Sequence, residues 1–572
     1  MGVISYIVDM YLREDSRKNK DGSVVTYVKL AHNERDPEKG YSKAKILYNF
    51  GRKEHLDIEQ LKRLIKSISR FLPPEDALEI QVQMKHRGRT FKWDKGRSYG
   101  GIYFISALWE KFHFKYLFEK HLVQRQFSTP ILQAVFAMVA DRCLAPSSKL
   151  AITEWVEKDV FIADLAKIDV QVLYRAMDFL LLHQKELERE IYWSVADLLN
   201  LEVDLIFFDT TSTYFETEDE SDLKKRGHSK DHRDNLPQVV IGLAVTRDGI
   251  PVKHWVFKGN TQDMSTIRQV KDDLSEWKLN RCIFVCDTGM SSEVNLQYLQ
   301  RGGGHYIVGR KMKSGEADVQ EALSQKGRYT EIPARPAVSA DRQAGGKEDL
   351  WAKEVIIGSG EKRKRLVVVK NIKEQKRHEL ARQKLTDYLE EQITKLNKSR
   401  KKATSKAACR LKSHRIYGKY IKELKGGTLS LNRTKLRQER RYDGKYLIQS
   451  SDDTLSLSDI VLGYKQLYDV EHAFRALKTT LDLRPNYHTN DERIRCHIFL
   501  CFIALVLVRI AENSTGKTWP KIRKQLNRIL YGEFRFENKT ICQLTELTKE
   551  QQEIFSSLKI KEPSIIVDIH DA

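Results

Sequence analysis

Two short apolar segments of the sequence each run into an aspartate, and these aspartates could bind a metal ion. Residues 205–208 (LIFF) lead directly into Asp209, and residues 281–286 (RCIFVC) lead into Asp287. Continuous apolar segments of this length are typical of strands that are buried on both faces. A carboxylate at the end of such a strand is costly to bury without a partner, and Mg²⁺ prefers carboxylate oxygens. For an isolated residue such as Asp209, an aspartate that caps the following turn is the alternative.

The segments around these aspartates alternate between strand-like and helix-like patterns. The expected order is three meandering strands, a helix, a strand, a helix and a strand. These elements are expected at residues 205–209, 238–246, 251–257, 266–277, 281–286, 291–300 and 305–308. This order predicts an α/β fold with a ribonuclease-H-like mixed-sheet core, whose first part covers residues 203–310. In that topology the strands that end at Asp209 and Asp287 can be neighbours, so their acids can meet.

A helix from about Leu457 to Leu481 is predicted to open the second part of the core, over residues 455–515. Several aromatic and charged residues recur in it at spacings of three and four, which places them on one helix face. They are Tyr464, Tyr468, Glu471, Arg475 and Lys478. A surface ladder of ion pairs is the alternative, although the neighbouring apolar residues indicate packing.

Residues 311–454 interrupt the core pattern and are predicted to form a basic insertion domain of β and helical structure. Lys401 and Lys402 belong to its basic part, and Leu385 to Leu396 marks one apolar helix face that could pair between protomers or pack internally. The one-sided charge favours contact with DNA phosphates, with a solvated surface as the alternative.

Smaller regions are predicted on both sides of the core. Residues 1–72 have the pattern of a small β-rich domain with a helix, and residues 101–202 that of a helical domain. Residues 73–100 are predicted to form a basic linker between them, and residues 516–572 a C-terminal helical region.

The composition favours a basic protein with a nucleic-acid partner. The chain has 99 Lys and Arg against 78 Asp and Glu, a formal net charge of +21, and such a surplus favours a polyanionic partner. The seven scattered cysteines, and the early charges at residues 13–15, argue against a secreted protein. The most apolar run, Ile498 to Val508, is shorter than the roughly 20 residues of a membrane span. We therefore expect a cytoplasmic protein without a membrane partner.

Taken in order, the motifs resemble those of bacterial insertion-sequence DDE transposases, in the group with a Tyr/Arg/Glu/Lys signature. The signature positions hold Tyr464, Leu467, Glu471 and Lys478, so a leucine replaces the expected arginine. The other motifs that carry the resemblance are Asp209-Thr210-Thr211, the loop of residues 227–233 with Leu236-Pro237-Gln238, Gly249-Ile250-Pro251, Gly259-Asn260-Thr261 with Asp263, and Asp287-Thr288-Gly289-Met290.

The resemblance implies an enzyme that binds terminal inverted repeats and catalyses metal-dependent DNA cleavage and strand transfer. It implies that Asp209, Asp287 and Glu471 are the catalytic triad and hold two Mg²⁺ ions, with Mn²⁺ as an alternative. Tyr464 and Lys478 are then expected to contact the phosphates of the transposon end, and Arg475 is a candidate substitute for the missing arginine.

The resemblance also implies partners and a location. Double-stranded DNA, as transposon ends and target, is the expected partner, and two protomers are expected to act as a dimer on it. The expected location is the bacterial cytoplasm, in association with the nucleoid. A metal-dependent nuclease with the same core, or a DNA-binding regulator without catalysis, are the alternatives.

Overall fold

The computed structural model of the chain describes residues 10–20, 23–35, 42–69, 92–122, 130–199, 201, 205–277, 283–312, 316–333, 350–398, 406–484, 486–536 and 539–571. The chain divides into two compact units. The smaller comprises Met1–Lys92, Arg535–Lys539 and Ala572, and the larger comprises Trp93–Phe534 and Thr540–Asp571. Most of the linker predicted at residues 73–100 lies outside the described residues, since residues 70–91 are not described.

The smaller unit contains a three-stranded antiparallel sheet and a helix. The strands pair in the order β1-β2-β3 and are followed by helix α1. Their bounds are β1 Met10–Lys18, β2 Val24–Arg35, β3 Ser42–Arg52 and α1 Ile58–Ser69.

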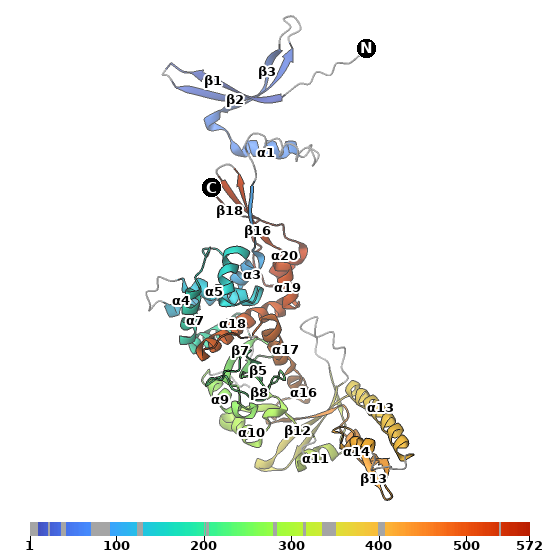
Figure 1. The fold of residues 1–572 in the computed structure, drawn as a ribbon. Coiled ribbons are helices and arrows are strands. Elements are labelled where there is room, and N and C mark those ends of the chain that lie inside the picture. Colours follow the sequence, from blue (N-terminus) through green and yellow to red (C-terminus); the bar gives the residue numbers. More distant parts are fainter. Residues whose placement is uncertain are drawn as a thin grey trace, which may run out of the picture. The chain divides into compact units, whose positions relative to one another are not determined.

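The larger unit is built on a nine-stranded mixed sheet (Figure 1). In spatial order its strands are β10 (Thr330–Ile332), β11 (Leu350–Ile357), β12 (Lys364–Asn371), β15 (Lys445–Ser450), β9 (His305–Arg310), β8 (Ile283–Cys286), β5 (Leu205–Tyr214), β6 (Gln238–Val245) and β7 (Pro251–Lys258). Strand β8 runs parallel to both β5 and β9, whereas the other pairs are antiparallel. The protein therefore has a mixed α/β fold.

Strand β5 lies at the centre of two hydrophobic cores because its successive side chains point to opposite faces. Leu205 and Phe207 join the larger core, which contains α17 (Tyr468–Arg475) and α18 (Asp491–Thr515). Ile206 and Phe208 join the second core, together with residues of α9 (Asp263–Ser275) and α10 (Glu293–Gln300). This confirms the prediction of a strand buried on both faces.

Helices from the first half of the unit and α18 share the larger core. The helices before the sheet are α3 (Gly100–Lys111), α4 (Phe114–Leu122), α5 (Ile131–Leu144), α6 (Lys149–Glu154), the π-helical turn Trp155–Asp159, α7 (Val170–Leu182) and α8 (Gln184–Leu199). Within the described part of the chain, α18 is the one helix long and apolar enough to cross a membrane, and 94% of its apolar window is buried inside the protein. A helix buried to this extent is typical of a protein core.

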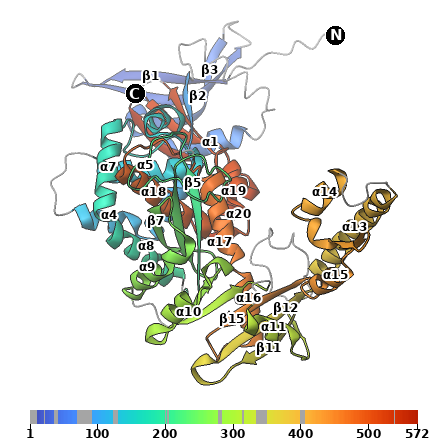
Figure 2. The same ribbon diagram turned by 60° about the horizontal axis from the view of Figure 1, so that its bottom comes forward.

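The insertion predicted at residues 311–454 is in part an extension of the core sheet. Strand β15 pairs antiparallel with β9, and β12 and β11 continue outward from it, with α11 (Ala317–Ser324) packed against β11 and β12. The part that leaves the sheet is the basic module, which we define as residues 372–443 (Figure 2). It contains α13 (Ile372–Asn397), α14 (Lys406–Ser413), β13 (Ile421–Leu424), β14 (Thr428–Leu431) and α15 (Arg433–Arg440).

The apolar face of α13 packs inside the basic module. Ile393 forms a small core with Ala408 and Leu429, and Leu396 packs against it. Of the two alternatives for this face, the structure shows internal packing.

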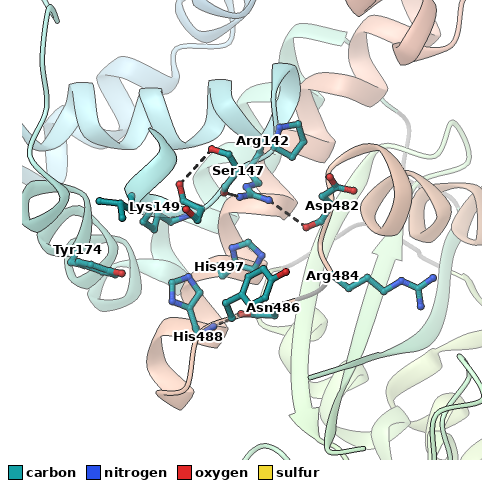
Figure 3. Close-up of a pocket in the computed structure, with 13 residues that line it drawn as sticks. Arg142, Ser147, Lys149, Tyr174, Asp482, Arg484, Asn486, His488 and His497 are labelled. Atoms are coloured by element: carbon teal, nitrogen blue, oxygen red, sulfur yellow. Dashed lines mark hydrogen bonds between the residues drawn. The ribbon is translucent and has the colours of Figure 1, made fainter. Parts of the chain in front are cut away.

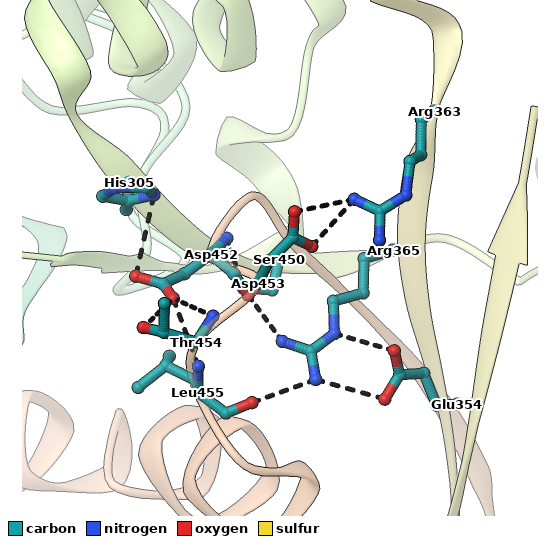
Figure 4. A network of polar contacts seen from close by, with 9 residues as sticks. All are labelled: His305, Glu354, Arg363, Arg365, Ser450, Asp452, Asp453, Thr454 and Leu455. Atoms are coloured by element: carbon teal, nitrogen blue, oxygen red, sulfur yellow. Dashed lines mark hydrogen bonds and ion pairs between the residues drawn. The ribbon is translucent and has the colours of Figure 1, made fainter. Parts of the chain in front are cut away.

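A buried network ties β12 to the loop between β15 and α16 (Leu457–Lys465) (Figure 4). Arg365 donates to both carboxylate oxygens of Glu354, at 3.0 and 3.1 Å, and to the carbonyls of Asp452 and Leu455. The fully buried Asp452 accepts from the backbone and hydroxyl of Thr454, at 2.8 and 2.7 Å. The network therefore fixes where the chain enters α16.

The C-terminal region differs from the helical region predicted for residues 516–572. It contains two helices and three strands, and the strands form a four-stranded sheet, in the order β18-β17-β16-β4, with a strand from the beginning of the larger unit. The bounds are β4 Lys92–Ser98, α19 Trp519–Leu526, β16 Leu530–Phe536, β17 Lys539–Leu544, α20 Lys549–Ser557 and β18 Ile566–Asp571. The pairing with β4 is a long-range contact, which local periodicity does not reveal.

Candidate active site

The register of two parallel strands brings Asp209 and Asp287 side by side. Phe208 of β5 pairs with Cys286 of β8, so the aspartates that follow lie at the same level on neighbouring strands. Neighbouring strands are about 4.8 Å apart. The Asp287 carboxylate is close enough to act on the ionisation of Asp209, so the two predicted acids lie side by side. Asp209 was expected at the end of its strand, but β5 continues beyond it to Tyr214 because residues 209–214 pair with β6.

Asp209 is the more buried of these acids, with 19% of its side chain exposed, whereas Asp287 is exposed. Burial raises the pKa of Asp209 to about 6, and the negative charges of Asp287 and Asp263 act in the same direction. The Lys230 ammonium and the Thr210 backbone N–H, which donates to Asp209 at 2.7 Å, oppose this rise. In such surroundings a nearby cation stabilises the charged form of the carboxylate.

Lys230 and Asp263 complete this polar group, and the sequence analysis gave neither of them a role. The Lys230 Nζ lies 3.6 Å from Asp209 Oδ1 and 3.3 Å from Asp263 Oδ2. It also donates to the Thr210 carbonyl at 2.6 Å, while the Thr210 hydroxyl donates to Asp263. Both residues stand in motifs that carried the family resemblance, which was the available signal. A position between two carboxylates is thus already occupied by a positive charge.

The loop that carries Lys230 is fixed through its next residue. Asp231 forms ion pairs with Lys478 at 2.9 Å and with Arg484 at 2.7 Å. Only 12% of the Lys478 side chain is exposed, and burial lowers its pKa although the Asp231 carboxylate opposes this. Lys478, predicted to contact DNA phosphate, therefore has a protein partner in this structure.

Tyr464 lies against the motif of the second aspartate. Its hydroxyl is hydrogen-bonded with Thr288 and Asp287, and burial raises its pKa to about 12. The hydroxyl also lies so close to Gly309 that a Cβ atom there would overlap it. A glycine in β9 is therefore required for Tyr464 to reach this position.

Glu471 lies on α17, whose buried face packs on β5 and β6, but its own side chain is exposed. The segment predicted as one helix is divided, since α16 ends at Lys465, α17 begins at Tyr468, and a π-helical turn follows at Ala476–Thr480. Tyr464 and Glu471 therefore do not lie on one continuous helix face. Within the described part of the chain, no group of three His, Cys, Asp or Glu side chains could hold a metal ion, so Glu471 is not gathered with the two aspartates.

The remaining predicted DNA contacts are placed as follows. Arg475 is exposed on α17, one turn after Glu471. Leu467, at the position of the expected arginine, packs against the larger hydrophobic core. Lys401 and Lys402 lie outside the described residues.

A pair of buried parallel strands that sets two carboxylates side by side, with basic residues around them, fits an enzyme that acts on the DNA backbone. Residues 204–507 match the family model of the transposase DDE domain, and residues 12–77 match that of the IS1634 family transposase N-terminal domain. The first match covers more than half of the 572 residues, and the chain belongs to the DDE transposase family. It is thus an insertion-sequence transposase, of an enzyme class that generally depends on divalent metal ions.

Other comparisons add little. No curated protein matches the chain. The solved structure of the piggyBac transposase synaptic complex with hairpin DNA is similar over 72% of this chain and 75% of that chain, with 9% sequence identity and a TM-score of 0.34. A likeness this distant carries no argument about the site.

Proposed function

We propose that this transposase cleaves DNA and transfers strands at a metal site formed by Asp209, Asp287 and Glu471. The observation that carries the proposal is the parallel register of β5 and β8, which sets the two aspartates on neighbouring strands. Two carboxylates this close repel each other, and a bound cation offsets that repulsion.

We also propose that the sheet contains a ribonuclease-H-like core. Its support is the order β7-β6-β5-β8-β9, in which three antiparallel strands are followed by two strands parallel to β5. Helices α9 and α10 pack on one face of these strands, and α17 and α18 on the other. This is the arrangement that the sequence pattern predicted around Asp209.

The residues around the two aspartates fit a divalent metal ion. Asp209 and Asp287 offer oxygen ligands, the kind that Mg²⁺ and Mn²⁺ prefer. The Lys230 ammonium, 3.6 Å from Asp209 and 3.3 Å from Asp263, supports a cation site there. We infer that Asp209 and Asp287, joined by Glu471, hold two Mg²⁺ ions. Such ions activate the attacking oxygen and stabilise the leaving 3′ oxygen.

Glu471 would join the aspartates through a shift of α17. Its helix is bounded by the break at residues 466–467 and by the π-helical turn at Ala476–Thr480, and π-helical turns are frequent at functional sites. Because the Glu471 side chain is exposed, it can reorient without loss of buried contacts. Binding of a DNA end is the event that we expect to drive this shift.

The phosphates of the DNA end would meet the basic residues around the site. Arg475 is exposed on the same helix as Glu471 and is the first candidate. Tyr464 and Lys478 would contact phosphates only after they exchange their present partners, Thr288 and Asp231. We expect two protomers to act as a dimer on paired ends and target DNA, in the bacterial cytoplasm and near the nucleoid.

Cleavage of short end duplexes by single variants tests this proposal. We expect Asp209→Asn, Asp287→Asn and Glu471→Gln to lower Mg²⁺-dependent cleavage at least about 1,000-fold, because each removes a metal ligand. Binding of the same duplex, measured without divalent ions, should change less than about threefold. The exposed Glu276, at the end of α9, provides a matched control as Glu276→Gln. Full cleavage by Glu471→Gln would remove that residue from the triad, and full cleavage by either aspartate variant would disprove the site.

A further inference from the structure

A cavity of about 430 Å³ lies away from the aspartates, between the helical part of the unit and the segment that leads into α18 (Figure 3). Arg142 of α5, Lys149 of α6 and Tyr174 of α7 line one side. Asn486 and His488, from the segment before α18, line the other. None of these residues has a role in the proposed cleavage reaction.

The cavity contains a buried ammonium without a counterion. Lys149 is 4% exposed, and among the described residues no carboxylate lies within ion-pair distance of its Nζ. Burying a charged group without a partner costs several kcal/mol. Burial lowers the pKa of Lys149 to about 8, and the nearby Arg142 acts in the same direction, whereas the Asp141 carboxylate opposes this fall.

Two further buried side chains that line the cavity have N–H donors without a hydrogen-bond partner. Arg142 is 4% exposed and binds the carbonyls of Leu481, Asp482 and Ser147, but its Nε has no hydrogen-bond partner. The side-chain amide nitrogen of Asn486, which is 3% exposed, also has none. Buried donors without partners are rare in folded proteins.

The acids near the cavity do not balance these charges. Asp141 is fully buried, but it accepts hydrogen bonds from the backbone and hydroxyl of Ser147, at 3.1 and 2.8 Å, and lies 3.7 Å from Arg142. Asp482, at the rim, is exposed to solvent. His488 is neutral at pH 7, because burial and then the charge of Lys149 lower its pKa to about 4. The charge left over inside the cavity is positive.

We propose that this cavity binds a phosphate group, held by the Lys149 ammonium and by N–H donors of Arg142 and Asn486. Phosphate oxygens accept charge-assisted hydrogen bonds from Arg and Lys, and all three side chains line this cavity. The volume is within the range of small-ligand sites and accommodates a phosphate together with an attached sugar or base.

The phosphate comes from the backbone of a DNA end or from free phosphate in solution. Arg484, at the rim of the cavity, is ion-paired with Asp231, next to the Lys230 that touches Asp209. The cavity is thus connected to the proposed cleavage site through the ion pair of Arg484 with Asp231 and through Lys230, the residue before Asp231. This DNA source rests on the proposed function, but the binding of phosphate itself does not.

The first test compares Lys149→Met with the wild type in binding and in stability. If the ammonium binds a phosphate of the DNA end, the variant should bind a short end duplex about tenfold more weakly in buffer without divalent ions; if it binds free phosphate, duplex binding should stay unchanged. The melting temperature of the free protein should stay the same or rise, because an unpaired buried charge has been removed. Lys158→Met provides the control, since Lys158 is exposed and paired with Glu154 at 2.8 Å, and it should change neither quantity. Lys149→Gln provides a second variant of similar shape if the methionine variant folds poorly.

The second test separates the two sources of phosphate. If the source is DNA, replacing the contacted phosphate of the duplex by one neutral methylphosphonate should weaken its binding to the wild type. The same replacement should not weaken its binding to Lys149→Met. If the source is free phosphate, inorganic phosphate at about 10 mM should raise the melting temperature of the wild type but not that of the variant. Either result supports the proposal, and the control Glu276→Gln should respond to the modified duplex and to phosphate as the wild type does. A Lys149→Met protein that melts at lower temperature, and responds to duplex and phosphate as the wild type does, would overturn it.

Discussion

At the scale of single residues, the charges of this protein are balanced in two different ways. Around the candidate active site, three acids have a cation from the chain itself: Lys230 lies between Asp209 and Asp263, and Asp231 binds Lys478. In the cavity lined by α5 and α6, Lys149 has no such partner. The first arrangement is stable without a ligand, whereas the second carries a cost that a bound anion would remove.

The cost of burying Lys149 predicts a pH dependence of stability. Because the pKa of Lys149 falls from 10.5 to about 8 on folding, its charged form destabilises the folded state at every pH below about 8. That penalty disappears as the pH rises from about 8 to 10.5. The free energy of unfolding of Lys149→Met should therefore exceed that of the wild type by up to about 3 kcal/mol at pH 7, at about 1.4 kcal/mol per pKa unit.

The measurement is urea unfolding of both proteins without phosphate, at pH 7, 8 and 10. The difference between the two should shrink as the pH rises. A difference that stays constant over this range would mean that the charge of Lys149 is not the cause.

At the scale of elements, the candidate active site depends on how the outer strands are joined to the core. Strand β15 pairs with β9 on one side and with β12 on the other, and the chain then turns directly into α16 and α17. Tyr464 and Glu471 are therefore positioned from the outer part of the sheet, whereas Asp209 and Asp287 are positioned from its centre.

The buried network of Arg365 should carry much of this junction's stability. Arg365→Met leaves the carbonyls of Asp452 and Leu455 without donors and removes the partner of the exposed Glu354, so we expect the free energy of unfolding to fall by about 2 kcal/mol. Arg363→Gln is the matched control, because the exposed Arg363 pairs with the exposed Asp453 on the surface. It should change stability by less than about 1 kcal/mol. Equal losses for the two variants in thermal and urea unfolding would contradict this assignment.

The last helix of the basic module offers the clearest surface for nonspecific DNA contact. Arg437, Arg440 and Arg441 are exposed at its end. If each neutralises a phosphate, the triple Gln variant should weaken binding to all duplexes alike. The slope of log affinity against log salt should become shallower by about 2 to 3. Fluorescence anisotropy at four salt concentrations, with Lys158→Gln as control, measures this slope, and an unchanged slope would place the DNA elsewhere.

At the scale of the whole molecule, one chain has one candidate site but transposition joins two DNA ends. The apolar face of α13 is used inside the basic module, so it does not provide the contact between protomers. We expect pairing to depend on the DNA ends themselves.

Mixing wild-type protein with Asp287→Ala on short end duplexes tests this dependence. If two protomers act together, mixed pairs should be inactive for joining, and an equal mixture should give about one quarter of the wild-type yield of joined product. Light scattering should show two protein chains per complex with DNA. A yield of one half, together with complexes that contain one protein, would exclude paired protomers.

The sequence by itself determined the central strands and the two aspartates that follow them. Leu205 to Phe208 and Ile283 to Cys286 are continuous apolar runs, and short runs of this kind are typical of buried strands. The strand order around Asp209 then limited the topology enough to bring Asp287 beside it. Family motifs supplied Glu471, because no local pattern distinguishes it from other exposed helix acids.

Only the tertiary structure decided the contacts between distant segments. The pairing of β15 with β9, the ion pair of Asp231 with Lys478 and the sheet that joins β4 to the C-terminal strands each connect residues more than 100 positions apart. Helical periodicity predicted one helix from Leu457 to Leu481, but packing against the sheet divides it. The cavity at Lys149 is also a product of folding, since a lysine at a helix start gives no sign that it will be buried without a counterion.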